Sequence, residues 1–193
     1  MQKTFKSQIT FLLLSFCTLT IGQNYKGEIV NIKNETLPVE IILDASSFNV
    51  NRLIKLQDKI TVIQNGTKLE YLPKDLKTFK IELEKETITF ESVDEAIFAQ
   101  GLYSNKVKLY KILKQISHGH IVRYYVIKKP NINNLAQMPA MGLSRLIKKD
   151  AMLPAIEDCK ISYDKVKNDE IKIKDEKILI DFIKDYESNC FQN

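Results

Sequence analysis

The sequence predicts an α+β fold. An antiparallel, β-rich N-terminal unit, built as a meander or a partly closed sheet, precedes a small helical C-terminal unit. Residues 24–130 alternate apolar with charged side chains between turn residues, which is typical of half-buried strands. Residues 144–193 change to helical spacing, and we expect this unit to pack on the sheet. Residues 131–143 between them carry no charge and no period, which indicates a loop or linker. A parallel α/β fold is disfavoured, because helices do not alternate with strands.

The N-terminal segment 1–23 is typical of a secretory signal peptide. Lys3 and Lys6 form its positive start, and residues 9–21 form an uncharged, apolar stretch. A membrane-spanning helix needs about 20 residues, so we expect cleavage after this segment and no transmembrane span in the mature chain. An uncleaved anchor is the alternative. Cys17 lacks the small preceding residue of a lipobox, so lipidation is not expected. We expect the protein in the periplasm, at the cell surface or secreted.

Strand signals recur along the β-rich unit. Asn65-Gly66 directly follows a β-branched run and is the strongest short hairpin signal in the chain. Along 79–83, apolar and charged residues alternate, which predicts one face turned inward and one turned outward. In the first strand the apolar positions are Val30 and Ile32. The expected strands are 27–32, 39–43, 59–63, 67–72, 79–83 and 88–92.

The segment 106–116 is ambiguous, because its apolar residues fit either a helix face or a strand. Gly119 follows this run, and residues 121–127 have the β-branched and aromatic composition of a strand. We favour two strands joined by a hairpin turn at His118-Gly119. A helix over 106–116 stays open as the alternative.

Short helices are expected in the C-terminal unit. Leu146 and Ile147 mark the first, and Pro154 ends or restarts the next. Asp175 is a good N-cap for a closing helix with an apolar stripe along one face. The residues of this stripe are Ile178, Leu179, Phe182, Ile183 and Tyr186.

Two cysteines, Cys159 and Cys190, stay in the chain once the signal segment is removed. An even count in an exported chain predicts one disulfide bond. For a closed loop of about 30 residues, the chain-entropy model gives a stabilisation of roughly 3.5 kcal/mol. Two free buried thiols are the alternative.

His118 and His120 are the only histidines, and one glycine separates them. On a strand, residues two apart face the same side, so both imidazoles can reach one metal ion. A zinc site also needs a third ligand; Glu91 and Asp94 are candidates, but no spacing supports them. The simpler interpretation is a turn with its glycine in the left-handed region.

Tyr103, Tyr110, Tyr124 and Tyr125 flank the same turn in the sequence. Because tyrosine offers a flat apolar ring and a polar hydroxyl, a groove lined by these residues would bind a sugar or a peptide. They are therefore candidate binding residues. The alternative is a half-buried sheet face with the hydroxyls at its wet edge.

Composition and motifs exclude several classes of protein. The chain is 44% hydrophobic and 27% charged with 6 Gly and 5 Pro, unlike collagen-like or wholly disordered chains. The net charge of +5 falls to +3 when Lys3 and Lys6 leave with the signal segment, so a nucleic-acid partner is not expected. The sequence also lacks the GxSxG, HExxH, P-loop and GxGxxG motifs.

Several short segments carry a resemblance to a known group of proteins. They are GEIV at 27–30, YLPKDLKTF at 71–79, a hairpin around Gly119, Asp158-Cys159 and the segment Tyr186–Cys190. In these the chain resembles uncharacterised, signal-peptide-bearing exported envelope proteins of Bacteroidota. The resemblance implies an envelope location, a β-rich N-terminal part and a helical end, and it implies no catalytic residue. The two histidines beside Gly119 depart from the pattern, which has a charged or small residue there.

These observations predict an exported cell-envelope protein that acts as a non-enzymatic binding or interaction module. We expect its partner to be an envelope protein or a glycan, and we expect no cofactor. The alternative is a small secreted hydrolase or metal-binding enzyme that uses His118 and His120.

Overall fold

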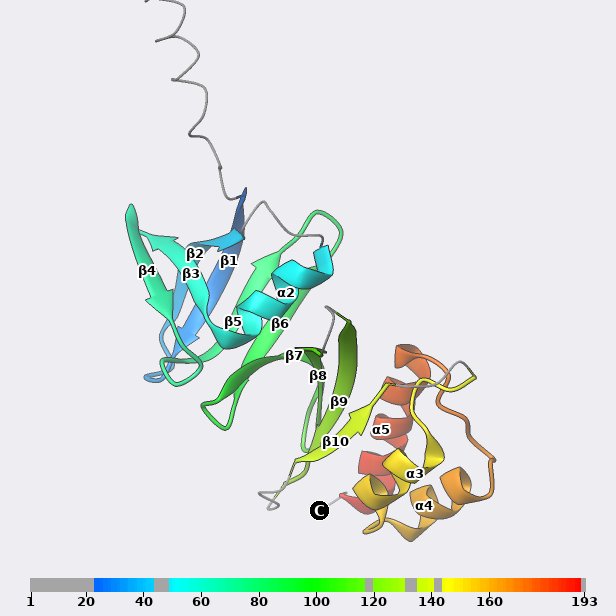
Figure 1. The fold of residues 1–193 in the computed structure, drawn as a ribbon. Coiled ribbons are helices and arrows are strands. Elements are labelled where there is room, and N and C mark those ends of the chain that lie inside the picture. Colours follow the sequence, from blue (N-terminus) through cyan, green and yellow to red (C-terminus); the bar gives the residue numbers. More distant parts are fainter. Residues whose placement is uncertain (1–22, 44–48, 117–119, 131–134, 141–143, 192–193) are drawn as a thin grey trace, which may run out of the picture.

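The structure is a computed structural model that describes residues 23–43, 49–116, 120–130, 135–140 and 144–191 (Figure 1). The predicted signal peptide, apart from Gln23, and the predicted turn at His118-Gly119 lie outside the described residues.

Over the described ranges, ten strands form one antiparallel sheet in the order β10-β9-β8-β7-β6-β5-β1-β2-β3-β4. The chain builds β1 to β4 first, returns with β5 to pair with β1, and then continues outward as a meander to β10. The fold class is therefore α+β with a dominant antiparallel sheet, as predicted. The strands are β1 (Gln23–Asn31), β2 (Thr36–Leu43), β3 (Ile60–Gln64), β4 (Thr67–Tyr71), β5 (Leu76–Glu82), β6 (Thr87–Val93), β7 (Ile97–Ser104), β8 (Lys108–Gln115), β9 (Ile121–Lys128) and β10 (Ala136–Pro139).

The helices of the described ranges lie between β2 and β3 and after β10 in the chain. None of them is both long and apolar enough to cross a membrane. They are α2 (Asn49–Asp58), α3 (Lys149–Met152), the 3₁₀ helix η2 (Leu153–Ile156), α4 (Lys160–Lys167) and α5 (Glu176–Cys190). The N-cap predicted for the closing helix is present, because the Asp175 carboxylate accepts the Ile178 N–H at 2.8 Å.

The predicted hairpins are confirmed where the turn residues carry the signal. Gln64 pairs with Thr67 around Asn65-Gly66, and both turn residues have positive φ, 50° and 77°. This left-handed geometry is the one that a two-residue hairpin turn needs, and Gly adopts it without steric cost. The ambiguous segment 106–116 contains strand β8, which pairs with β9.

The buried face of β1 differs from the sequence prediction. Ile29 is fully buried, whereas Ile32 is 60% exposed. Gly27 explains the choice of face, because a Cβ there would collide with the Lys80 carbonyl oxygen and the Ile41 side chain. Only glycine fits this close contact, so Gly27 lies on the buried face. Ile29, two residues further along the strand, faces the same way.

A core of aromatic and aliphatic side chains lies beneath α2. Phe79 is at its centre: the Phe90 ring stacks on it with centroids 4.7 Å apart, and the Phe98 ring meets it edge-on at 5.0 Å. Leu56 of α2 is buried in this core, and Leu53 of the same helix packs against it. α2 is a correction to the sequence prediction, which placed only strands within 24–130. The residues of α2 are mostly polar, and its few apolar side chains form a stripe that is too short to predict a helix.

The C-terminal helices pack on β7 to β10 through a second apolar cluster, which includes Leu109, Tyr125, Met138 and Phe182. β10 corrects the predicted linker 131–143, which contains this four-residue strand. Only Met138 of β10 is fully buried, so the sequence shows no alternation there. Pairing with β9, which a local pattern cannot reveal, holds the strand.

α2 and α5 lie on the same face of the sheet. Phe98 of β7 packs beneath α2, and Gln100, two residues further, faces the same way. Gln100 pairs with Lys111 of β8, and directly opposed residues share a face. Lys111 in turn contacts Glu176 at the start of α5, with Nζ 3.1 Å from Oε1.

Glu187 of α5 fastens the β7–β8 hairpin to the helices. Its carboxylate is buried and accepts the Val107 N–H at 2.7 Å, the Asn105 amide at 2.5 Å and the Tyr103 hydroxyl at 3.3 Å. Three donors satisfy the carboxylate, so its burial is compensated. The helical region is thus tied to the sheet by polar as well as apolar contacts.

The opposite face of the sheet holds a smaller core around Tyr110 and Val126, both of which are buried. The sheet curls so that the turn after β6 approaches β9, where Lys128 Nζ lies 3.3 Å from an Asp94 oxygen. This curvature buries the side chains around Tyr110 and Val126 between strands of one sheet. Among the described residues, no helix belongs to this core.

Candidate functional site

A candidate site lies where β2 and β3 separate. The two strands pair only through Glu40 with Ile63 and Ile41 with Val62. Strands joined by a tight turn stay paired up to that turn, but here the connection contains α2. The helix holds the end of β2 and the start of β3 apart, which leaves a wedge between them.

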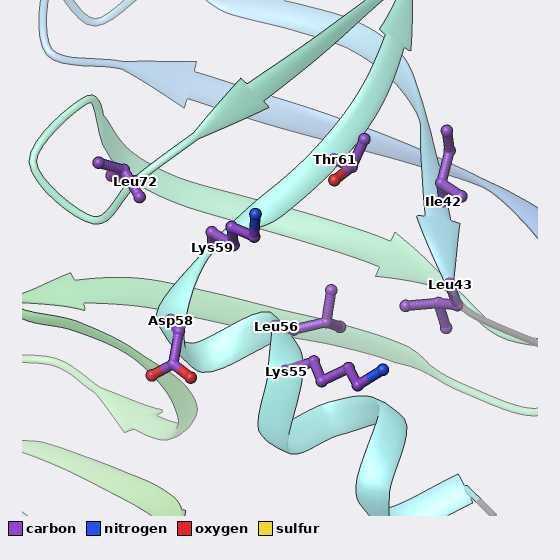
Figure 2. A pocket seen from close by; sticks show the side chains of 8 residues that line it. All are labelled: Ile42, Leu43, Lys55, Leu56, Asp58, Lys59, Thr61 and Leu72. Atoms are coloured by element: carbon purple, nitrogen blue, oxygen red, sulfur yellow. The ribbon is translucent and has the colours of Figure 1, made fainter. Parts of the chain in front are cut away.

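A pocket of about 440 Å³ occupies this wedge (Figure 2). We call it the β2–β3 pocket. Its volume is within the range of about 300–1,000 Å³ that is usual for small-molecule sites. It is lined by Ile42, Leu43, Lys55, Leu56, Asp58, Lys59, Thr61 and Leu72.

The lining combines apolar side chains with charged ones. Leu43 and Leu56 are buried and form an apolar wall. Lys55 and Lys59 bring two ammonium groups to the pocket, and Figure 2 shows the Asp58 carboxylate directed away from both. Apolar walls with a few polar groups are typical of sites that bind and orient a small ligand.

Lys59 is held in place by a neighbouring strand. Its Nζ lies 3.1 and 3.0 Å from the two carboxylate oxygens of Glu70 on β4. Both side chains are more than half exposed, so the pair contributes little to stability. The Lys59 ammonium group is therefore held beside Glu70 at the pocket, while its side chain stays partly exposed to solvent. Lys55 lies in the last turn of α2, where its positive charge interacts favourably with the partial negative charge of the helix end.

The four tyrosines singled out in the sequence do not come together. Tyr103 and Tyr125 face the C-terminal helices, whereas Tyr110 and Tyr124 belong to the opposite face. Three of the hydroxyls donate to carboxylates, of Glu187, Glu91 and Glu176. The fourth ring, that of Tyr124, lies 4.8 Å below the Lys114 ammonium group.

The histidine pair is only partly described. His118 lies outside the described residues, and His120 is exposed between β8 and β9. Among the described residues, the structure gathers no group of three or more His, Cys, Asp or Glu side chains suited to a metal ion. The candidate ligand Asp94 instead contacts Lys128, and Glu91 contacts Lys108.

Glu91 lies at the centre of a polar cluster on the sheet. One of its oxygens accepts from Lys108 Nζ at 2.7 Å and from the Tyr110 hydroxyl at 2.8 Å. Burial raises the pKa of Glu91, but the hydrogen bonds and the charge of Lys108 outweigh it, so the pKa lies below its ordinary value. Burial and the adjacent carboxylate raise the pKa of Tyr110. Both groups therefore keep one protonation state at neutral pH.

Glu176 forms a cluster of the same kind at the start of α5. Its Oε1 accepts from the Tyr125 hydroxyl at 2.7 Å and from Lys111 at 3.1 Å. Burial opposes ionisation, but these partners hold the pKa of Glu176 below its ordinary value, and burial together with Glu176 raises the pKa of Tyr125. The cluster ties α5 to β8 and β9.

We expect an acid-side loss of stability from these carboxylates. The folded-state pKa of Glu91 lies below the unfolded value of about 4.5, so its contribution is complete above pH 4.5 and is lost as pH falls through the folded-state pKa. Glu91→Gln should therefore flatten the decline in unfolding free energy between about pH 5 and 3, measured by urea unfolding. Glu84→Gln, at an exposed position, is the control. An unchanged pH slope in Glu91→Gln would contradict this role.

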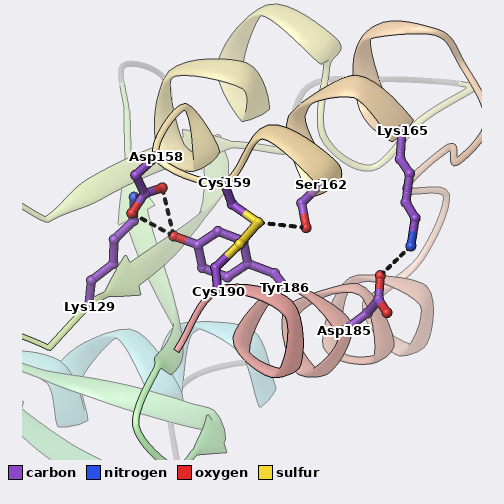
Figure 3. The surroundings of a disulfide bond; sticks show 8 residues. All are labelled: Lys129, Asp158, Cys159, Ser162, Lys165, Asp185, Tyr186 and Cys190. Carbon is purple, nitrogen blue, oxygen red and sulfur yellow. Dashed lines mark hydrogen bonds and ion pairs between the residues drawn. A yellow bond between two sulfur atoms is a disulfide. The ribbon is translucent and has the colours of Figure 1, made fainter. Parts of the chain in front are cut away.

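Cys159 and Cys190 form the predicted disulfide bond, with their Cα atoms 5.9 Å apart. Figure 3 shows the bond between the start of α4 and the end of α5, beside a polar network. In that network Asp158 accepts from Lys129 at 2.7 Å and from the Tyr186 hydroxyl at 2.8 Å. Such a bond is compatible with an oxidising compartment.

Comparison of the chain with protein-family models, with curated proteins and with solved structures finds no match.

Proposed function

We propose that the protein is an exported, non-enzymatic binding module of the cell envelope. We further propose that the β2–β3 pocket holds its ligand, a small amphipathic molecule with an acidic group. The observation that carries this proposal is the lining of the pocket, which combines buried Leu43 and Leu56 with two lysines. The apolar wall fits a hydrocarbon body, and an ammonium group at its rim fits a carboxylate, sulfonate or phosphate.

Export is supported by the signal-like segment 1–23 and by the resemblance to exported envelope proteins of Bacteroidota. The disulfide bond between Cys159 and Cys190 agrees with this location, because such bonds persist outside the reducing cytoplasm.

The polar clusters outside the pocket are not suited to general acid–base catalysis at neutral pH, because the pKa values of their groups are shifted away from it. General acid–base catalysis works best with groups whose pKa lies near the working pH. In Glu91 and Glu176 the pKa is shifted down, and in Tyr110, Tyr125 and Tyr186 it is shifted up. Each of these groups therefore keeps one protonation state at neutral pH, and its hydrogen bonds connect elements of the fold.

A matched pair of fluorescent probes tests the proposal. Anilinonaphthalene sulfonate carries an apolar body and an anion, and neutral phenylnaphthylamine has the same rings without the sulfonate. We expect the anionic probe to bind saturably at one site and about tenfold more tightly than the neutral probe, because an ammonium group pairs with the sulfonate. Titration by fluorescence gives both affinities.

Variants then locate the site. In Lys55→Gln/Lys59→Gln, the preference for the anionic probe should disappear while the neutral probe binds as before. Thr61→Tyr should weaken both probes, because a bulky ring on β3 fills the pocket. The control is Lys33→Gln/Lys77→Gln, which removes two lysines that do not line the pocket. Equal affinity for both probes in the unaltered chain, or an unchanged preference in the first variant, would overturn the proposal.

A further inference from the structure

β4 forms an outer edge of the sheet that the described residues leave unpaired. β4 ends the strand order, and within the described residues no strand pairs with its outer side (Figure 1). Four of its five residues are exposed. Leu69 is 36% exposed, and Leu72 just beyond the strand is 41% exposed. An open strand with exposed leucines is a template for pairing with another strand.

The turn before β4 decides which backbone groups face outward. In a two-residue hairpin the residues that flank the turn, Gln64 and Thr67, exchange both backbone hydrogen bonds. Along an antiparallel strand, alternate residues bond to the same partner, so Leu69 also points its N–H and C=O toward β3. The N–H and C=O groups of Lys68 and Glu70 therefore point away from the sheet.

The sequence around Leu69 is complementary to itself. If a second β4 lies antiparallel with Leu69 opposite Leu69, Lys68 of each copy faces Glu70 of the other. This register makes both Lys68–Glu70 pairs hydrogen-bonded pairs, with the outward backbone groups in contact. It also places opposite charges directly across the strands and the two leucines in the close, non-hydrogen-bonded position.

We propose that β4 pairs with β4 of a second copy of this chain, antiparallel and centred on Leu69. The two sheets then continue into one another across a twofold axis, which is the common symmetry of homodimers. Charges on an edge strand usually deter pairing, because an unrelated strand leaves them opposite unsuitable partners. Here the order of the charges on Lys68 and Glu70 disfavours pairing with unrelated strands and favours pairing with a second copy of β4. The contact is short, so the dimer is weak and depends on concentration.

Charge reversals test the register. Glu70→Lys places Lys68 opposite a lysine, and Lys68→Glu places Glu70 opposite a glutamate, so each should weaken dimerisation at least tenfold. Lys68→Glu/Glu70→Lys restores opposite charges in the same register and should restore the dimer. Glu70→Lys and the double variant both lose the contact with Lys59, so the difference between them reports the strand pairing alone.

Sedimentation velocity over a concentration series measures the dimerisation constant, and thermal unfolding confirms that each variant is folded. The proposal expects dimer in the unaltered chain and the double variant, and monomer in the two single variants. A monomer at every concentration, or equal dimerisation in all four folded proteins, would overturn it. Sedimentation needs no probe, and Lys68→Glu leaves the contact between Lys59 and Glu70 in place, so a loss of dimer in that variant is separate from the ligand proposal.

Discussion

Cys159→Ser/Cys190→Ser is expected to lower the free energy of unfolding by about 3.5 kcal/mol. The bond closes a loop with a sequence separation of 31 residues, and its loss returns that conformational freedom to the unfolded chain. The bond also joins the start of α4 to the end of α5, where Cys159 is buried. Replacing both cysteines avoids a free thiol beside its former partner.

Urea unfolding of the oxidised chain and of this variant measures the difference. The matched control is Asn189→Ala, a change at an exposed position in the last turn of α5 that leaves the disulfide intact. We also expect faster amide exchange in α4 and α5 of the cysteine variant than in β1 to β5, because only the former lie within the loop. A loss below about 1 kcal/mol would show that the packing of the helices on the sheet suffices without the bond.

Gln57→Leu is expected to cost about 3 kcal/mol, although leucine is apolar and of similar size. The Gln57 side chain is buried, and its amide bonds to the backbone of Leu113 twice. Nε2 donates to the carbonyl oxygen at 2.6 Å, and Oε1 accepts the N–H at 2.7 Å. Pairing between β7 and β8 ends at Gln100 and Lys111, so a side chain of α2 replaces the missing strand.

Leucine at position 57 leaves a buried N–H and a buried C=O without partners, and each unsatisfied group costs about 1–3 kcal/mol. Gln57→Glu should be at least as damaging, because a carboxylate accepts the N–H but has no proton for the carbonyl oxygen. Gln115→Leu, at an exposed position on β8, is the control and should change stability by less than about 0.5 kcal/mol. Equal stability of the two leucine variants, measured by urea unfolding, would contradict the role of Gln57.

The sequence predicts best where the determinant is local. The hairpin at Asn65-Gly66 follows from two adjacent residues, and the N-cap at Asp175 follows from one residue before an apolar stripe. The disulfide bond was predictable by elimination, because only two cysteines follow the signal-like segment. In each case a short stretch of chain contains the whole signal.

The sequence fails where a distant contact decides the outcome. Leu56 of α2 packs in the core, and Gln57 of α2 bonds to the backbone of β8. Neither contact produces an apolar pattern of helical spacing in the sequence. The buried side of β1 is set at Gly27 by close contact with Lys80 and Ile41. β10 exists because β9 pairs with it.

The candidate site was not predictable for the same reason. The β2–β3 pocket exists because two strands separate around a helix, and Lys55 and Lys59 have no motif around them. Conversely, the four tyrosines are close in the sequence, but the alternation of side chains along each strand divides them between the two faces of the sheet.

Amide chemical shifts measured during a titration with decanoate test the central claim most directly, with decanol as the neutral comparison. We expect decanoate to shift the amides of Ile42, Leu43, Leu56 and Thr61, saturably and at lower concentration than decanol. Shifts that spread evenly over the sheet, or that gather on the opposite face around Tyr124, would contradict a ligand site between β2, β3 and α2.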